Sequence, residues 1–160
     1  MPTSYSIGFD RYLTVKDGNR IPVICIEENT SHKSAWFSYK RWANLVAMTD
    51  YIDSKLQQAV RGEEIRERLH IGGLWYVSIT QNFKCVDIRE FYQHRLDDVR
   101  PTRTGIALRI SEWQRVKNLI EKIHGEHPNI AATECCIYDT SHRHLADALA
   151  CTGCNPLNTR

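Results

Sequence analysis

The sequence predicts an α+β protein of two tandem units, each a four-stranded antiparallel sheet followed by a long helix, with a short C-terminal tail that contains Cys and His. Three observations support this prediction. Short stretches of the first half recur in the second half, several segments alternate between apolar and polar residues, and two segments carry an apolar stripe at helical spacing. We place the units at residues 1–62 and 63–126 and the tail at residues 127–160.

The internal repeat consists of three sets of matching residues. Residues 5–15 match residues 69–79 at an offset of 64, residues 24–28 match residues 86–90 at an offset of 62, and Trp42 matches Trp113 at an offset of 71. The offset changes only between strand-like segments, where a loop can change length, and the pattern therefore indicates duplication with divergence. Chance similarity of short apolar stretches is the alternative explanation.

Strands are predicted from residues that alternate between apolar and polar, the pattern of a half-buried strand. Residues 76–80 (YVSIT) show this alternation clearly, and residues 86–92 and 105–110 are expected to form further strands. Turn-forming residues stand at 17–19 (Asp-Gly-Asn) and 81–82 (Gln-Asn). We expect a hairpin turn at each of these two places.

A long helix is expected to close each unit. From Ser38 to Val60, apolar residues recur at three- and four-residue spacing, which predicts one helix of about six turns. A second stripe begins at Ser111, which forms a capping-box pattern with Gln114, and Gly125 marks the expected end.

The two units are expected to share a core. A four-stranded sheet covered by one helix buries little apolar surface, so we expect the units to pack as an internal pseudo-dimer that buries their helix stripes against each other. Assembly into a larger homo-oligomer through sheet edges stays open. The charge-dense run at residues 61–68 (RGEEIRER) is interpreted as a solvated linker or helix end.

Composition excludes some protein classes. The chain has 160 residues, too few for a large multi-domain enzyme, and its formal net charge of +2 indicates no particular partner. No run approaches the roughly eighteen consecutive apolar residues of a membrane span, and no leader pattern begins the chain. We therefore expect a soluble intracellular protein without membrane partners, whose six cysteines stay reduced unless a metal binds them.

Three ordered motifs in the second unit carry a resemblance to a known family. They are VDIREFY at residues 86–92, RPTRTGIAL at residues 100–108 and ISEWQRVKNLIEKI at residues 110–123. With these motifs, residues 72–124 resemble the single-stranded-DNA-binding domain of the positive-cofactor-four family of transcriptional coactivators (p15). The first unit keeps chiefly Trp42 and the strand pattern, so its link to the family rests on the internal repeat.

The resemblance implies a curved antiparallel sheet followed by a helix, dimerisation through the helices, and single-stranded DNA that runs over the strands of both subunits. It also implies DNA contacts at matching positions. These are Phe83 and Lys84 in a hairpin, Tyr92 at the end of the Asp-Ile-Arg-Glu strand, and Arg103 in the Pro-x-Arg-x-Gly turn. Trp113 matches a residue that packs the helix on the sheet.

The residue types suit single-stranded nucleic acid, because exposed bases stack on aromatic rings and phosphates attract cations. The candidate contacts are Trp75, Phe83, Lys84, Arg89, Tyr92, Arg100 and Arg103 in the second unit and Arg11, Lys16 and Arg20 in the first. Alternatives remain, since Arg89 could pair with Asp87 in its own strand and exposed cations often only keep a protein soluble. Tyr12 and Tyr76 are expected to serve in core or sheet packing.

The tail carries candidate metal ligands. A Cys-x-x-Cys pair with two further soft ligands could complete a tetrahedral zinc site. The candidate ligands are Cys136, His142, His144, Cys151 and Cys154. The spacing matches no standard zinc finger, and a reduced tail without metal and a disulfide are the alternatives. Cys25 and Cys85 lie in expected strands and are interpreted as buried small apolar residues.

These observations predict a non-enzymatic protein that binds single-stranded or melted DNA, as a transcription coactivator or as an accessory protein of replication or repair. Its expected location is the nucleus, or the virion or host nucleus if it is viral, and its further partners would be transcription or replication proteins. The alternative is a structural or assembly protein, for instance a viral one, that uses the duplicated fold for protein contacts. Catalysis is not expected, because the sequence has no Gly-rich phosphate loop and no His-Glu-x-x-His motif.

Overall fold

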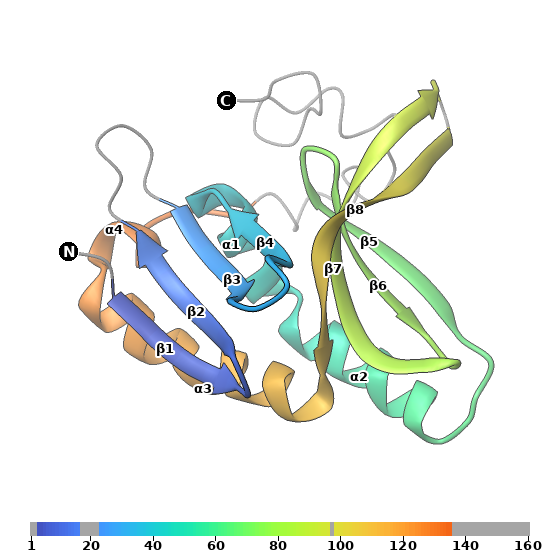
Figure 1. Ribbon diagram of the computed structural model, residues 1–160, viewed down its shortest axis with the longest axis horizontal. Helices are drawn as coiled ribbons and strands as arrows, with labels where there is room; N and C mark the ends of the chain where they lie inside the picture. The colour runs from blue at the N-terminus through green and yellow to red at the C-terminus, as the bar shows by residue number, and fades with distance from the viewer. Residues whose placement is uncertain (1–2, 17–22, 97, 136–160) are drawn as a thin grey trace.

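The computed structural model describes residues 3–16, 23–96 and 98–135. These residues form two four-stranded antiparallel sheets and four helices (Figure 1). The predicted α+β fold of two sheet-and-helix units is confirmed. Within the described ranges, no helix is long and apolar enough to cross a membrane.

Each unit presents four strands before its helix. Sheet 1 has the order β1-β2-β3-β4 and sheet 2 the order β5-β6-β7-β8. The first unit consists of β1 (Thr3–Gly8), β2 (Arg11–Lys16), β3 (Val23–Glu28), β4 (Ser34–Phe37), α1 (Tyr39–Ala47) and α2 (Thr49–Val60). The second unit consists of β5 (Arg66–Gly72), β6 (Trp75–Thr80), β7 (Phe83–Arg95), β8 (Asp98–Arg109) and α3 (Ile110–Glu126), and a short α4 (Pro128–Ala131) follows it.

The two sheets pair their strands in the same register. A shift in the β1–β2 ladder between Ser6 and Gly8 recurs in the β5–β6 ladder between His70 and Gly72. In the next ladder, Leu13 pairs with Ile26 as Val77 pairs with Ile88. The sequence offsets therefore join residues that occupy equivalent positions in the two sheets.

The helix of the first unit is divided, although the sequence predicted a single helix. Its break lies at Met48, whose N–H donates to the carbonyl of Leu45 at 3.1 Å. The Thr49 hydroxyl donates to the carbonyl of Val46 at 3.0 Å. A tightened turn and a hydroxyl bonded to a preceding carbonyl both bend a helix. The bend lets α1 contact β5 while α2 lies against β6 and β7.

The start of α3 also differs from its prediction. The helix begins at Ile110, and Glu112 Oε1 accepts a hydrogen bond from the backbone N–H of Arg109 at 2.9 Å. A carboxylate at the third helical position satisfies a free N–H at the helix start. Glu112, rather than the pair Ser111 and Gln114, therefore caps α3, and the helix ends at Glu126 close to the predicted end.

Helices α2 and α3 each contact the sheet of the other unit. In Figure 1, α3 runs beneath β1 and β2, while α2 runs beneath β6 and β7, and α3 contacts β1 as α2 contacts β6 and β7. One hydrophobic core cluster contains residues from both units. The predicted internal pseudo-dimer is confirmed, but the helices pack mainly on sheets rather than on each other: α2 packs on the opposite sheet, and α3 contacts β1 of the opposite sheet as well as β7 and β8 of its own. The sheets offer broader apolar faces than a helix does, and this packing buries them.

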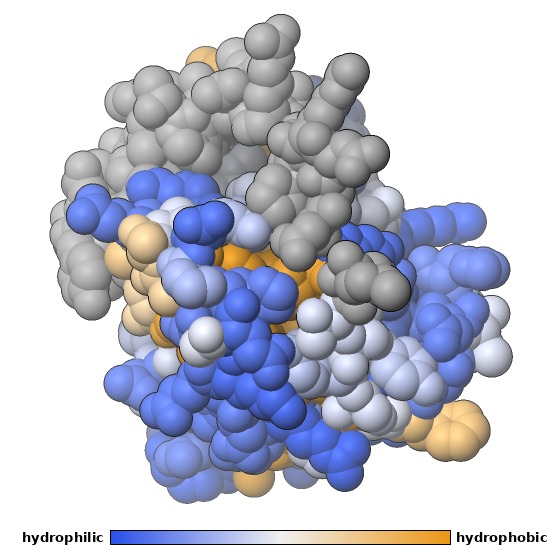
Figure 2. Space-filling view, turned by 90° about the vertical axis from the view of Figure 1, so that its left-hand side faces the viewer, coloured by the Kyte–Doolittle hydropathy of each residue, from blue (hydrophilic) through white to orange (hydrophobic). Residues whose placement is uncertain are grey.

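Apolar residues are concentrated inside this shared core. Viewed from the side that lies at the left of Figure 1, the described surface is mostly hydrophilic, and apolar residues show in a patch near its middle (Figure 2).

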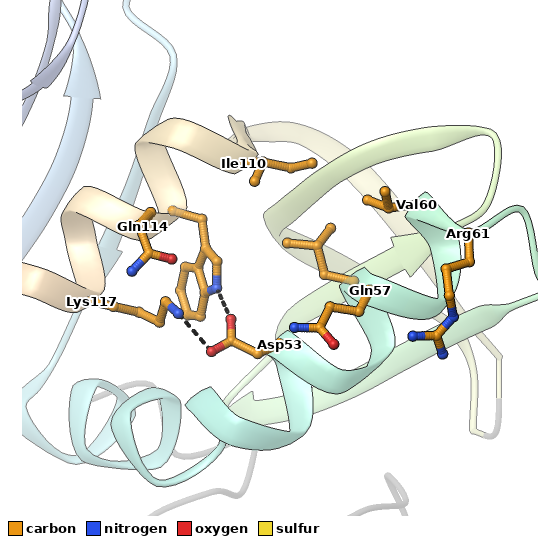
Figure 3. A pocket seen from close by; sticks show the side chains of 9 residues that line it. Asp53, Gln57, Val60, Arg61, Ile110, Gln114 and Lys117 are labelled. Atoms are coloured by element: carbon orange, nitrogen blue, oxygen red, sulfur yellow. Dashed lines mark hydrogen bonds and ion pairs between the residues drawn. The ribbon is translucent and has the colours of Figure 1, made fainter.

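A tryptophan from each unit reaches the helix of the other unit. Trp113 Nε1 donates to Asp53 Oδ1 at 2.8 Å, and Lys117 Nζ donates to the other oxygen of Asp53 at 2.6 Å (Figure 3). Trp42 Nε1 donates to His124 Nε2 at 3.1 Å. Asp53 and His124 differ by 71 positions, as the two tryptophans do. The contacts between the helices are thus related by the same pseudo-symmetry as the sheets.

The bond between Trp42 and His124 predicts that acid lowers stability. Burial lowers the pKa of His124, and its Nε2 accepts a hydrogen bond and must therefore carry no proton. An unfolded histidine has a pKa of about 6.5, so below that pH the unfolded chain binds the additional proton. We expect this contribution to be present above about pH 6.5 and to be lost as the pH falls through the lower folded-state pKa.

The measurement is denaturant unfolding at about pH 7.5 and about pH 5. In the variant His124→Gln, the part of the pH dependence that belongs to this histidine should disappear. An unchanged dependence in the variant would assign the acid sensitivity to other groups.

Candidate nucleic-acid interface

The face of sheet 2 that points away from the core is defined by the strand alternation. In β6, Val77 and Ile79 are buried in the core, so Tyr76, Ser78 and Thr80 point to the other side. The pairing of the strands extends this face across the sheet. We call the following residues the outer face of sheet 2: Arg66, Arg68, His70, Tyr76, Ser78, Thr80, Cys85, Asp87, Arg89, Gly105, Ala107 and Arg109.

Two arginines of β5 supply exposed positive charge on this face. Arg66 and Arg68 are both exposed. The guanidinium of Arg68 lies 5.5 Å from the ring centroid of Tyr76 and 5.4 Å from that of Phe91. A cation above aromatic rings is held by the ring quadrupole while its N–H groups stay available. The outer face therefore combines a positioned cation with aromatic surface.

Arg66 and Arg68 are not among the contacts that the sequence predicts. The sequence predicts a linker or helix end at residues 61–68, but the last three of these residues begin β5. The signal was the alternation of the two arginines with Ile65, Glu67 and Leu69, of which Ile65 is buried and Leu69 packs on the core. The density of charge concealed this period-two pattern.

Phe83 and Lys84 lie at the turn between β6 and β7. The predicted turn at residues 81–82 is confirmed, and Phe83 pairs with Thr80 across it. Phe83 is 69% exposed, and Lys84 is also exposed. A hollow of about 190 Å³ lies beside the turn and is lined by Glu64, Ile65, Arg66, Thr80, Gln81, Asn82 and Phe83. The fold thus brings the predicted aromatic residue to the same hollow as Arg66 of β5.

Tyr92, Arg100 and Arg103 belong to the long hairpin of β7 and β8. Tyr92 pairs with Arg100 across the hairpin, and both side chains are exposed. Arg100 also pairs with Asp98, with 3.3 Å between its Nε and the carboxylate. Arg103 is exposed and makes no hydrogen bond or ion pair with any residue that the structure describes. All three predicted contacts are therefore accessible to a ligand.

Gly105 ends the Pro-x-Arg-x-Gly segment because the neighbouring strand passes very close. A Cβ atom at this position would lie 2.6 Å from the carbonyl oxygen of Ile88 and 2.8 Å from the Cα of Arg89. These are backbone atoms of the paired strand, and they could move aside only by disrupting the strand pairing. Glycine therefore permits the close pairing of β7 with β8 at this point.

Arg89 is engaged within the sheet. Its guanidinium bonds to both carboxylate oxygens of Asp87, at 3.0 and 3.1 Å, and donates to the carbonyl of Thr102 at 3.1 Å. The alternative in which Arg89 pairs inside its own strand is the one that the structure supports. Arg89 lies on the outer face, but its charge is already compensated.

The side chains of two predicted contacts, Trp75 and Arg11, are enclosed where the units meet. Trp75 is 1% exposed and packs edge-on against Trp36, with ring centroids 5.9 Å apart. Arg11 bonds to Glu28 at 2.7 Å and to Glu112 of the second unit at 2.9 Å. Trp75 is therefore unavailable for stacking on bases, and Arg11 is unavailable for binding phosphates. Residue type alone could not distinguish an exposed ring or cation from an enclosed one.

Of the two remaining predicted contacts of the first unit, Lys16 lies within the described residues and Arg20 does not. Lys16 is exposed on sheet 1 and lies 3.7 Å from the carboxylate of Glu27. Arg20 lies outside the described residues.

Tyr76 packs on the outer face as expected. It forms a small buried cluster with Phe91 and Val99, and its ring centroid lies 4.8 Å from that of Phe91. Burial raises the pKa of the Tyr76 hydroxyl. Cys25 is buried as expected, whereas Cys85 is only half-buried, and burial raises the pKa of both thiols. Both cysteines are free and remain protonated near neutral pH.

The zinc prediction concerns a part of the chain that lies outside the described residues. This applies to all five candidate ligands, Cys136, His142, His144, Cys151 and Cys154. Within residues 3–16, 23–96 and 98–135, no group of three or more His, Cys, Asp and Glu side chains gathers as a metal site would require. Zinc binding by the tail therefore stays a prediction.

A second hollow lies between α2 and α3, away from the outer face. It has a volume of about 350 Å³, and the Trp113, Asp53 and Lys117 contacts form part of its wall (Figure 3). Among its charged groups, Asp53 and Lys117 are bonded to each other, and the exposed Arg61 pairs with Glu63 at 2.7 Å. These cations are already paired, and the hollow lies away from a nucleic-acid path over sheet 2.

Comparison with known proteins agrees with the motifs of the second unit. Residues 77–119 match the family model described as Transcriptional Coactivator p15 (PC4). No curated protein and no solved structure matches the chain. The matched range covers most of β6, the whole of β7 and β8 and the first part of α3, whereas the first unit lies outside it. The second unit, with its exposed arginines and aromatic rings, is therefore similar to the domain of this coactivator family.

Proposed function

We propose that this protein binds single-stranded or melted DNA over the outer face of sheet 2 and the adjoining hairpin of β7 and β8. The observation that carries the proposal is the set of exposed cations beside exposed rings. Arg66, Lys84 and Arg103 make no ion pair with any described residue, and Phe83 and Tyr92 are 69% and 45% exposed. The match to the coactivator family supports the same function.

The chemistry of this surface fits a single strand better than a duplex. Unpaired bases expose flat faces that stack on rings such as Phe83 and Tyr92, and each stacked base contributes about 1 to 3 kcal/mol. Phosphates between the bases would lie near Arg66, Arg68 and Lys84. We propose that the protein acts without catalysis in the nucleus, as a transcription coactivator or as an accessory protein of replication or repair.

The double variant Phe83→Ala with Arg103→Ala is expected to weaken binding to a labelled oligo(dT) by about tenfold or more, because one stacking platform and one phosphate contact are lost. Loss of one cation should also reduce the slope of log K against log salt by about 0.7. Fluorescence anisotropy at several salt concentrations measures both quantities.

A matched control is the double variant Phe9→Ala with Arg115→Ala. Phe9 is 92% exposed in the turn between β1 and β2, and Arg115 is exposed on α3, so this variant removes the same residue types elsewhere. Its affinity should equal that of the parent. Unchanged affinity in the Phe83 and Arg103 variant would move the site elsewhere, and absence of binding by the parent at low salt would favour the structural or assembly function.

A further inference from the structure

The outer faces of the two sheets carry different charges at equivalent positions. The outer face of sheet 2 has four arginines and one aspartate. The register places Ser4 of sheet 1 at the position of Arg68, and Glu27 at the position of Arg89. Sheet 1 thus has a neutral residue at the position of the exposed Arg68 and an acidic residue at the position of Arg89, whose charge Asp87 compensates.

Several polar groups of the outer face of sheet 1 bond to one another. This face, defined by the same strand pairing, consists of Ser4, Ser6, Tyr12, Thr14, Lys16, Val23, Cys25, Glu27, Ser34 and Trp36. Ser4 and Thr14 form a hydrogen bond of 3.2 Å between their hydroxyls. Lys16 lies 3.7 Å from the carboxylate of Glu27. At the β4 edge of this face, the guanidinium of Arg41 lies 4.6 Å from the ring centroid of Trp36, but it donates to the carbonyls of Trp36 and Gly72. A phosphate on sheet 1 would therefore meet a compensated lysine beside a carboxylate that repels it.

The long hairpin is a second difference between the sheets. β7 and β8 have 13 and 12 residues, whereas β3 and β4 have 6 and 4. Tyr92 and Arg100 lie in the part by which the second hairpin exceeds the first. Sheet 1 has no described counterpart of these two side chains.

We propose that a single strand binds over sheet 2 alone, so that the internal pseudo-dimer has a one-sided binding surface and the first unit serves to complete the core. This proposal rests on the proposed function. Four strands spaced about 4.8 Å apart span about 14 Å. At about 3.4 Å per phosphate of a stacked strand, that width holds about four nucleotides, and the hairpin extends the contact.

The proposal is tested with paired variants of the full chain and a labelled oligo(dT) of about eight nucleotides, a length within the range of known single-strand sites. Arg66→Ala with Arg68→Ala removes two cations from sheet 2. It should lower affinity by about tenfold or more and reduce the salt slope by about 1.4. Ser4→Ala with Lys16→Ala alters the outer face of sheet 1. It should change affinity by less than about twofold and leave the slope unchanged.

A gain-of-charge variant tests the same proposal from the opposite direction. Ser4→Arg with Glu27→Arg places on sheet 1 the arginines that sheet 2 carries at the equivalent positions. It should raise the salt slope for an oligo(dT) of about sixteen nucleotides, which can reach both sheets, more than for one of about eight. Thermal melting of each variant verifies that the chain remains folded.

The outcomes separate the two proposals. Equal losses from the sheet 1 and sheet 2 variants would overturn one-sided binding and leave DNA binding in place. Absence of binding by the parent chain at low salt would overturn both. A loss confined to the sheet 2 variant, with a length-dependent gain from the two added arginines, is the expected result.

Discussion

Replacing Trp113 with alanine is expected to lower the free energy of unfolding by about 3 to 5 kcal/mol. Trp113 is 1% exposed and belongs to the core cluster that both units share. The substitution would leave a large cavity where the units meet. It would also remove the N–H that donates to Asp53 at 2.8 Å. Denaturant unfolding followed by far-ultraviolet circular dichroism measures the change.

The variant Trp113→Phe separates packing from hydrogen bonding. It keeps most of the apolar ring but removes the donor, while Asp53 retains its bond with Lys117 at 2.6 Å. We expect a loss of about 1 to 3 kcal/mol from this variant, smaller than that of the alanine variant. An alanine variant that melts like the parent would show that Trp113 is not a core residue.

Replacing Arg11 with methionine is expected to destabilise the protein by about 3 to 5 kcal/mol, the usual cost when one partner of a buried ion pair is removed. Arg11 joins the units by bonds to Glu112 at 2.9 Å and to the carbonyl of Ala107 at 2.6 Å. Glu112 is 2% exposed. Its carboxylate would keep one hydrogen bond from the backbone N–H of Arg109 and would lose its nearby positive charge. Chemical unfolding curves measure the loss.

The double variant Arg11→Met with Glu112→Gln is the control for this effect. It removes the buried carboxylate of Glu112. Glu28 also loses Arg11, but it is only half-buried and keeps the hydrogen bond from Ser31. The double variant should therefore recover part of the stability that the single variant loses. Glutamine also keeps an oxygen that can accept from the Arg109 backbone. If the second substitution adds its own loss instead of recovering stability, the charge pair does not contribute as the geometry indicates.

Much of the fold could be predicted because strand faces and helix stripes are local patterns. Val77 and Ile79 are core residues, as the alternation of residues 76–80 predicts. Trp42 and Trp113, which the internal repeat relates to each other, both lie in the shared core. The division of the first helix at Met48 could not be predicted from the apolar stripe. That stripe is nearly the same in a straight helix and a bent one.

The candidate site was predicted only in part. Phe83 and Arg103 are exposed, and the motifs of the second unit predict that they contact DNA. Trp75 and Arg11 were expected on the same surface, but they are enclosed where the units meet. Conversely, Arg66 belongs to a strand that the charge-dense run concealed. Burial depends on what packs against a residue, and composition does not reveal this.

The sequence by itself determined which residues form strands, which side of each strand faces the core, and which positions of the two units correspond, because these features follow from periodicity and repetition along the chain. Only the tertiary structure decided that α2 packs on sheet 2, that α3 reaches β1 of sheet 1, and that Glu112 of one unit pairs with Arg11 of the other. It also decided that Arg66 and Arg68 of sheet 2 are exposed, whereas Arg89 is engaged by Asp87. The physical reason is that burial and charge compensation arise between segments far apart in the chain, and local patterns carry no information about those neighbours.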